Sequence, residues 1–149
     1  MVTALMIFMY AQAAANNDTQ PATVAGATGT LVINAAGFAS AEGQAIIRVF
    51  NSDDGFPRDD DKAFRILKVK IVDGACTVEL KDIPAAVYAI LVIHDTNGNG
   101  KLDTNWIGFP DEPVGISNYP EPGRPVFDKA AVEVSAGGNV SVSVAVSEV

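Results

Sequence analysis

The sequence predicts an all-β fold, a two-sheet antiparallel β-sandwich of about seven strands. Several segments alternate apolar and polar residues with a period of two, which is typical of strands that bury one face. Gly, Pro, Asn and Asp residues separate these segments and favour turns. Helical periodicity is absent except for a turn expected at residues 59–64, so helices contribute little to the predicted fold.

Seven segments are expected to form strands, at residues 31–35, 44–50, 68–72, 76–80, 88–94, 130–134 and 140–146. The last is the clearest, because four valines alternate there with small residues. The alternation predicts a core that includes Val78, Leu80, Ile90, Val92, Val132, Val142 and Val144. Cys76 shares a face with Val78 and Leu80, so we interpret it as a small core residue rather than a reactive thiol.

Size, charge and composition restrict the function. The 149 residues favour a single domain, and the formal net charge of -8 argues against nucleic acid, whose binding needs a basic surface. The single cysteine excludes an intramolecular disulfide and a thiolate metal cluster. The single histidine excludes His-rich metal centres, which leaves hard cations with oxygen ligands as the metals to consider.

The first 15 residues are interpreted as a cleaved signal peptide. Residues 2–10 (VTALMIFMY) form an apolar run, and residues 11–15 (AQAAA) offer small side chains for cleavage near Ala13 or Ala15. The run is too short to span a bilayer, which takes about 20 residues, so the mature chain is expected to have no membrane span. Residues 16–29 are small and polar and predict a flexible leader, before a single β-sandwich domain at 30–149. We therefore expect a periplasmic or extracellular protein; the alternative is that the apolar run forms a buried strand or helix.

The most informative stretch follows the expected strand at 88–94. It matches the first nine positions of the D-x-[DN]-x-[DN]-G calcium loop, with Gly100 at the sharp turn. Calcium takes about six to eight oxygen ligands, and the odd positions of such a loop direct oxygens inward. We therefore expect a structural calcium ion bound by the side chains of Asp95, Asn97, Asn99 and Asp103 and by the backbone carbonyl of Lys101.

The match to the calcium loop is partial, because position 12, normally a bidentate acid, is Trp106. Another segment would have to complete the coordination shell, and the acidic candidates are Asp53, Asp54, Asp59, Asp60, Asp61, Asp111 and Glu112. The alternative is a metal-free turn, since Asn-Gly and a second Asn-Gly in succession are a strong turn signal. His94, directly before the loop, is interpreted as a hydrogen-bonded packing residue rather than a catalyst.

The order of the motifs resembles a known family. The most specific part is HDTNGNGKLDTN at 94–105, which follows DDGFP at 53–57 and DIPAAVYA at 82–89 and precedes Gly108, GISN at 115–118 and Phe127. Over residues 31–146 the chain resembles the bacterial secreted family called domain of unknown function 2141. The resemblance implies an exported immunoglobulin-like or transthyretin-like sandwich, and it implies no particular activity.

One turn departs from the pattern of that family. Its usual form before the central tyrosine is Pro-x-Gly-x-Tyr, and Ala86 stands here at the glycine position. If this position requires a positive φ, alanine costs about 1 kcal/mol relative to glycine. Tyr88 is expected to bond its hydroxyl to nearby backbone, as in a tyrosine corner.

Together these observations favour an exported, non-enzymatic domain, a binding or structural module of the cell envelope with an unknown protein or glycan as its ligand. Two alternatives are a metal-free accessory protein of an envelope assembly and a small enzyme on a transthyretin-like fold. Transthyretin-like hydrolases use several histidines and related dioxygenases use two, whereas this chain has one, which disfavours the enzyme. Trp106 and Phe109 could stack on a sugar or peptide, but we favour rings that cap an open end of the sandwich.

Overall fold

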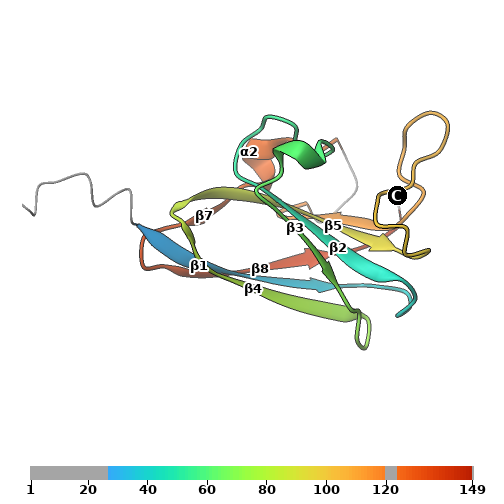
Figure 1. Cartoon of the computed structure of the whole chain (residues 1–149), viewed down its shortest axis with the longest axis horizontal. Coiled ribbons are helices and arrows are strands. Elements are labelled where there is room, and N and C mark those ends of the chain that lie inside the picture. The colour runs from blue at the N-terminus through green and yellow to red at the C-terminus, as the bar shows by residue number, and fades with distance from the viewer. Residues whose placement is uncertain (1–26, 120–123, 149) are drawn as a thin grey trace, which may run out of the picture.

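Two β-sheets face each other in the computed structural model of the protein (Figure 1). The structure describes residues 27–119 and 124–148. The predicted signal peptide lies outside the described residues, as does most of the predicted leader. Strand β1 (Thr28–Ala36) begins two residues before the expected start of the domain at 30.

The smaller sheet has the order β4-β1-β8, formed by β4 (Ala75–Pro84), β1 and β8 (Asn139–Ala145). The larger sheet has the order β3-β2-β5-β6, with β7 also paired to β5. Its strands are β2 (Gln44–Phe50), β3 (Arg65–Val69), β5 (Ala86–Asp95), β6 (Val114–Ile116) and β7 (Val132–Val134). The predicted all-β sandwich is thus confirmed.

Details of the strands differ from the prediction. Strand β6 was not expected. Strand β3 begins three residues earlier than the expected segment at 68–72 and also ends three residues earlier. Strands β1 and β8 pair in parallel, whereas the sequence predicted antiparallel pairing throughout. The chain reaches β8 from β7, which belongs to the other sheet, so β8 is not the return arm of a hairpin with its neighbour β1. Period-two alternation records which face is buried and carries no information on strand direction.

The smaller sheet buries one face only, which explains the clear alternation in β1 and β8. Of the seven predicted core residues, five are buried and two, Val78 and Val132, are half-buried against the same cluster. Cys76 is buried on the inner face of β4, which confirms its interpretation as a packing residue. Burial raises the pKa of the Cys76 thiol, so the reactive thiolate is disfavoured there.

The larger sheet is covered on both faces, which explains the nearly unbroken apolar runs of β2 and β5. Its inner face contacts the smaller sheet, and on its outer face α2 (Phe127–Ala130) packs against Phe50 and Ala89. The expected turn near 59–64 contains the 3₁₀-helix η2 (Asp60–Lys62). Oδ1 of Asp60 in this helix lies 2.7 Å from Nε of the buried Arg48 of β2. Within residues 27–119 and 124–148, no helix is long and apolar enough to cross a membrane.

The turn between β4 and β5 follows one expectation and corrects another. The Tyr88 hydroxyl donates to the Pro84 carbonyl at 2.6 Å, as expected for a tyrosine corner. Ala86, however, is the first residue of β5 and does not have a positive φ. The left-handed residue is Asp82, with φ of 56°, where the register of β4 with β1 shifts by one residue. The strain expected at Ala86 is therefore absent, because the chain is already extended there.

Candidate functional site: the loop between β5 and β6

The predicted calcium loop lies in the long connection between two paired strands. Strand β5 ends at Asp95, and β6 returns antiparallel to β5, so residues 96–113 extend from one end of the larger sheet (Figure 1). The His94 N–H donates to the Pro113 carbonyl at 2.9 Å, which brings the two ends of the loop together. On the other side, Gln44 at the start of β2 is the register partner of Asp95.

Asp95 is the anchor of the loop and is fully buried. Its Oδ2 accepts hydrogen bonds from Gln44 Nε2 and from the Gly100 N–H, both at 2.8 Å, and its Oδ1 accepts one from the Asn99 N–H at 3.1 Å. Burial alone raises the pKa of this carboxyl. The bonds from Gln44 and from the backbone of Gly100, Asn99 and Gly98 outweigh burial and hold its pKa below the ordinary value of 3.8. Asp95 is therefore a carboxylate that fixes the turn.

Gly100 permits the sharp turn expected of it. Its φ is 84°, a left-handed conformation that favours glycine. A Cβ at this position would lie 2.9 Å from Lys68 Nζ, so a side chain would also displace the lysine. The structure thus places a cationic side chain from the neighbouring strand β3 beside the acidic loop.

The other predicted ligands converge on Asp103. Asn97 Nδ2 lies 2.6 Å from Asp103 Oδ2, and Asn99 Nδ2 lies 2.8 Å and 2.9 Å from the two carboxylate oxygens. The amide oxygens accept hydrogen bonds from the backbone of the loop. The Asn97 oxygen accepts one from the Asn99 N–H, and the Asn99 oxygen accepts one from the Lys101 N–H. The Lys101 side chain is exposed, as expected if only its backbone is used. The loop therefore holds two carboxylates and two amides in one connected network.

Glu112 is the acidic candidate that the fold brings to the loop. It is 5% exposed, and its carboxylate accepts the Thr96 N–H at 3.0 Å and the Asp103 N–H at 3.1 Å. These bonds join the beginning of the loop to its far side. Glu112 therefore uses its charge to close the loop around Asp103. Its spacing from Asp95 matches no motif, so its signal in the sequence was only that of a nearby acid.

Three of the remaining acidic candidates have their partners in the region of η2. Asp54 lies 3.1 Å from Lys62 Nζ, Asp59 accepts the Asp61 N–H, and Asp60 pairs with Arg48, so these acids stabilise the region of η2. Asp111 is exposed, and its backbone N–H donates to the Asp103 carbonyl. In the described part of the chain, no three His, Cys, Asp or Glu side chains are grouped to hold a metal. Any ion here would need amide and backbone oxygens as well.

Trp106, at position 12 of the calcium motif, lies at the end of a projection. Thr104 and Pro110 form a bridge, and the residues between them extend outward as a tip, which we define as residues 105–109. Trp106 is 94% exposed and Phe109 58% exposed, so the interpretation that these rings cap the sandwich is wrong. The rings point to solvent because the bridge directs the chain away from the sheets.

His94 serves packing, as predicted. It is 1% exposed, and its Nε2 lies 2.9 Å from the Glu42 carbonyl oxygen. Its ring meets that of Phe38 edge to face, with centroids 5.3 Å apart. These contacts leave the imidazole inside the sandwich, behind the first residue of the loop.

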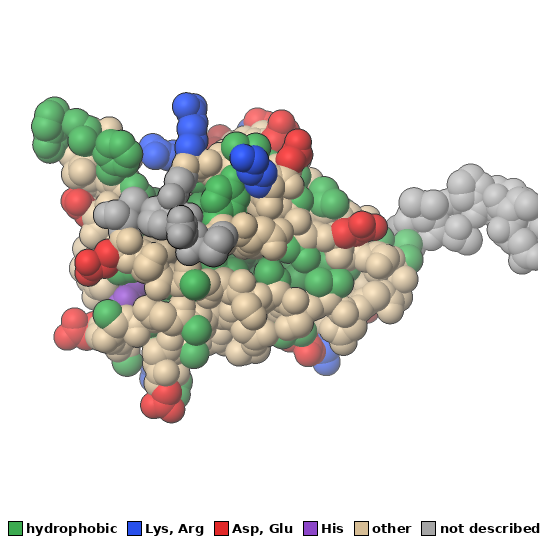
Figure 2. Space-filling view, turned by 180° about the vertical axis from the view of Figure 1, so that it is seen from behind, with side chains coloured by type: hydrophobic (Ala, Val, Ile, Leu, Met, Phe, Trp, Pro, Cys, Tyr) green, Lys and Arg blue, Asp and Glu red, His purple; other side chains and the backbone are tan. Residues whose placement is uncertain are grey.

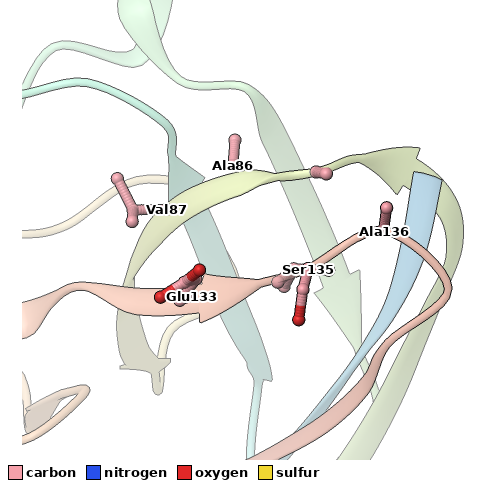
Figure 3. A pocket seen from close by; sticks show the side chains of 7 residues that line it. Ala86, Val87, Glu133, Ser135 and Ala136 are labelled. Atoms are coloured by element: carbon pink, nitrogen blue, oxygen red, sulfur yellow. The ribbon is translucent and has the colours of Figure 1, made fainter. Parts of the chain in front are cut away.

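A shallow groove lies beside β7, away from the loop (Figure 3). It holds about 330 Å³ and is lined by Ala85, Ala86, Val87, Glu133, Val134, Ser135 and Ala136. One of these lining residues, Glu133, is titratable. A general acid–base pair needs two such groups, so this lining does not provide one.

Comparison with known proteins gives a family. Residues 33–143 match the family model described as "Uncharacterized protein conserved in bacteria (DUF2141)". The match includes the loop, covers β1 and β8 in part, and covers every other strand in full. No curated protein and no solved structure matches the chain. The resemblance inferred from the motifs at 53–57, 82–89 and 94–105 is confirmed: the chain belongs to the DUF2141 family.

Proposed function

We propose that this protein is an exported, non-enzymatic domain of the cell envelope whose loop at 95–103 binds calcium as a structural ion. The observation that carries the proposal is the convergence on Asp103, where the amides of Asn97 and Asn99 lie 2.6–2.9 Å from its carboxylate. Turning each amide about its last torsion would place its oxygen beside Asp103, at the cost of the backbone hydrogen bonds that these oxygens accept from Asn99 and Lys101. A cation bound between these oxygens and Asp103 would have to offset that cost, which agrees with a site of modest affinity.

The donor set fits a hard cation of modest affinity. Asp95 and Asp103 supply two charges, Asn97 and Asn99 two amide oxygens, and Lys101 a backbone carbonyl. Calcium takes about six to eight oxygens, so water would supply the rest. Two charges and an open shell favour a dissociation constant of about 0.1–1 mM, which suits an extracellular module. The ammonium of Lys68 beside Gly100 weakens the site further through like-charge repulsion.

Export and the absence of catalysis are supported by other observations. The apolar run at 2–10 and the small residues after it favour secretion. The single histidine is buried on the Glu42 carbonyl, which disfavours a role in acid–base chemistry. Mass spectrometry of the protein from the envelope fraction should find a chain that starts at Ala14 or Asn16. An intact Met1 on cytoplasmic protein would contradict export.

Thermal unfolding with calcium, magnesium or EDTA tests the ion site. Calcium at a hundredfold excess over the dissociation constant should stabilise the wild type by about 2.7 kcal/mol. Asp95→Ala should remove most of this gain because it deletes a charged ligand, and Asn97→Ala should remove less. Lys101→Ala should change little, because only its backbone is used.

Two variants keep this test decisive. Asp103→Asn alters a half-buried ligand and should lose the calcium response even if Asp95→Ala unfolds. Asp111→Asn, an exposed acid at the base of the tip, is the matched control and should keep the response. Equal shifts in wild type and Asp103→Asn would place the site elsewhere. No shift in wild type would favour the metal-free accessory protein.

A further inference from the structure

The tip at residues 105–109 concentrates apolar surface on a loop that projects beyond the ends of the sheets (Figure 1). Trp106, Ile107 and Phe109 are 94%, 55% and 58% exposed. They are three of the seven large hydrophobic side chains that are exposed in the described residues. Figure 1 shows this loop extending beyond the ends of the sheets, and Figure 2 shows hydrophobic side chains gathered on a projection. The tip is convex, so its partner must be a medium or a surface that it can enter.

Four of the five backbone N–H groups of the tip, all but that of Trp106, are hydrogen-bonded within the tip. The Asn105 side-chain oxygen accepts the Ile107 N–H at 3.0 Å and the Phe109 N–H at 3.1 Å. The Asn105 N–H donates to the Phe109 carbonyl at 2.8 Å, and the Gly108 N–H donates to the Asn105 carbonyl at 2.9 Å. In an apolar medium an unpaired polar backbone group is costly. These four N–H groups can therefore leave water without losing a partner, and they are not free to pair with a peptide strand.

The charge and the exposed area of the tip favour a bilayer over a protein as its partner. Residues 104–110 (TNWIGFP) carry no charge, and Arg58, whose Nη2 lies 3.2 Å from the Gly108 carbonyl, adds a cation beside the tip. Large aromatic side chains bury about 150–250 Å² each, so the three side chains fall short of the roughly 800 Å² per partner of a stable protein interface. Insertion into a bilayer has no such minimum area, and Trp and Phe favour the boundary between headgroups and acyl chains.

We propose that the tip at residues 105–109 inserts into the interface of a phospholipid bilayer and docks the protein on a membrane surface. The insertion is apolar, since a chain with a net charge of -8 is not attracted to anionic lipid. Arg58 lies where it would meet headgroup phosphates. This docking does not depend on the proposed calcium site, so the two proposals can fail separately.

Trp106 is the single tryptophan of the chain, so its fluorescence reports directly on the tip. The mature protein is titrated in EDTA with phosphatidylcholine vesicles, and emission, acrylamide quenching and co-flotation are measured. We expect the emission to shift to the blue, quenching to fall, and protein to float with the vesicles. Phe109→Ala retains the probe and should weaken partitioning on the order of tenfold. Val87→Ala, an exposed apolar residue at the start of β5, is the control and should bind as the wild type does.

Circular dichroism first establishes that both variants are folded. Unchanged Trp106 emission at millimolar lipid would overturn the proposal, and so would equal partitioning of wild type and Phe109→Ala. Protection of Trp106 from acrylamide by a soluble oligosaccharide, with none by vesicles, would also overturn it and assign the tip to glycan binding.

Discussion

Replacing Asp95 with asparagine is expected to destabilise the fold by about 2–4 kcal/mol even without calcium. The carboxylate offers two oxygens, and the amide offers one. An amide oxygen in the place of Oδ2 keeps the bonds from Gln44 and Gly100, but its NH₂ group then faces the Asn99 N–H. One charge-assisted bond is lost, at about 1.5–3 kcal/mol, and the two that persist weaken because the acceptor is now neutral.

Urea denaturation in EDTA, followed by circular dichroism, measures this difference. Asp111→Asn removes the same charge from an exposed site and should lie within about 0.5 kcal/mol of wild type. If Asp95→Asn is no less stable than Asp111→Asn, the hydrogen bonds to Asp95 do not hold the loop, and the reasoning fails.

The stability difference between wild type and Asp95→Asn is expected to depend on pH. The pKa of Asp95 is lower in the folded protein than its ordinary value of 3.8, so the folded state favours the carboxylate. Its contribution is complete above the unfolded pKa and is lost as the pH falls through the folded pKa. The stability gap between wild type and Asp95→Asn should therefore be constant near pH 7 and shrink below about pH 4. A gap that widens on acidification would contradict the direction of the shift.

Two further predictions concern the sandwich itself. Val142→Ala removes a buried side chain from β8 and should cost about 1–3 kcal/mol in urea denaturation, whereas Ser143→Ala on the exposed face should cost little. Equal effects would mean that the two faces of β8 are assigned wrongly. Tyr88→Phe leaves the Pro84 carbonyl without its 2.6 Å hydrogen bond and should cost about 1–2 kcal/mol, with a change near zero refuting the tyrosine corner.

The fold was largely predictable, because hydrophobic burial leaves a direct record in the chain. Strand β8 alternates because the smaller sheet has one wet face, and that alternation identified Val142 and Val144 as core residues. The parallel pairing of β8 with β1 leaves no such record, because both directions bury the same residues. The short strand β6 was missed for a related reason. Its three residues are too few to show a period, and its position is fixed by pairing with β5.

The candidate site was predictable only as far as local spacing determines it. From Asp95 to Asp103 the loop turns on Gly98 and Gly100. The side chains of Asn97 and Asn99 meet that of Asp103, whereas Asp95 bonds to the loop backbone. Beyond Asp103 the spacing rule fails. In the motif the twelfth position returns a bidentate acid to the ion, but here the chain enters the bridge between Thr104 and Pro110 before that position is reached.

The bridge between Thr104 and Pro110 determines where Trp106 and Glu112 lie. It sends Trp106 outward, so the residue in the place of the twelfth ligand becomes the exposed end of the tip. It also returns the chain to the sheet, where Glu112 receives the N–H groups of Thr96 and Asp103. The carboxylate of Glu112 thus holds the base of the projection through backbone hydrogen bonds. The connection between β5 and β6 therefore has an incomplete set of cation ligands and a tip whose base is hydrogen-bonded. For this reason we expect a weak ion site and an exposed apolar surface in the same eighteen residues.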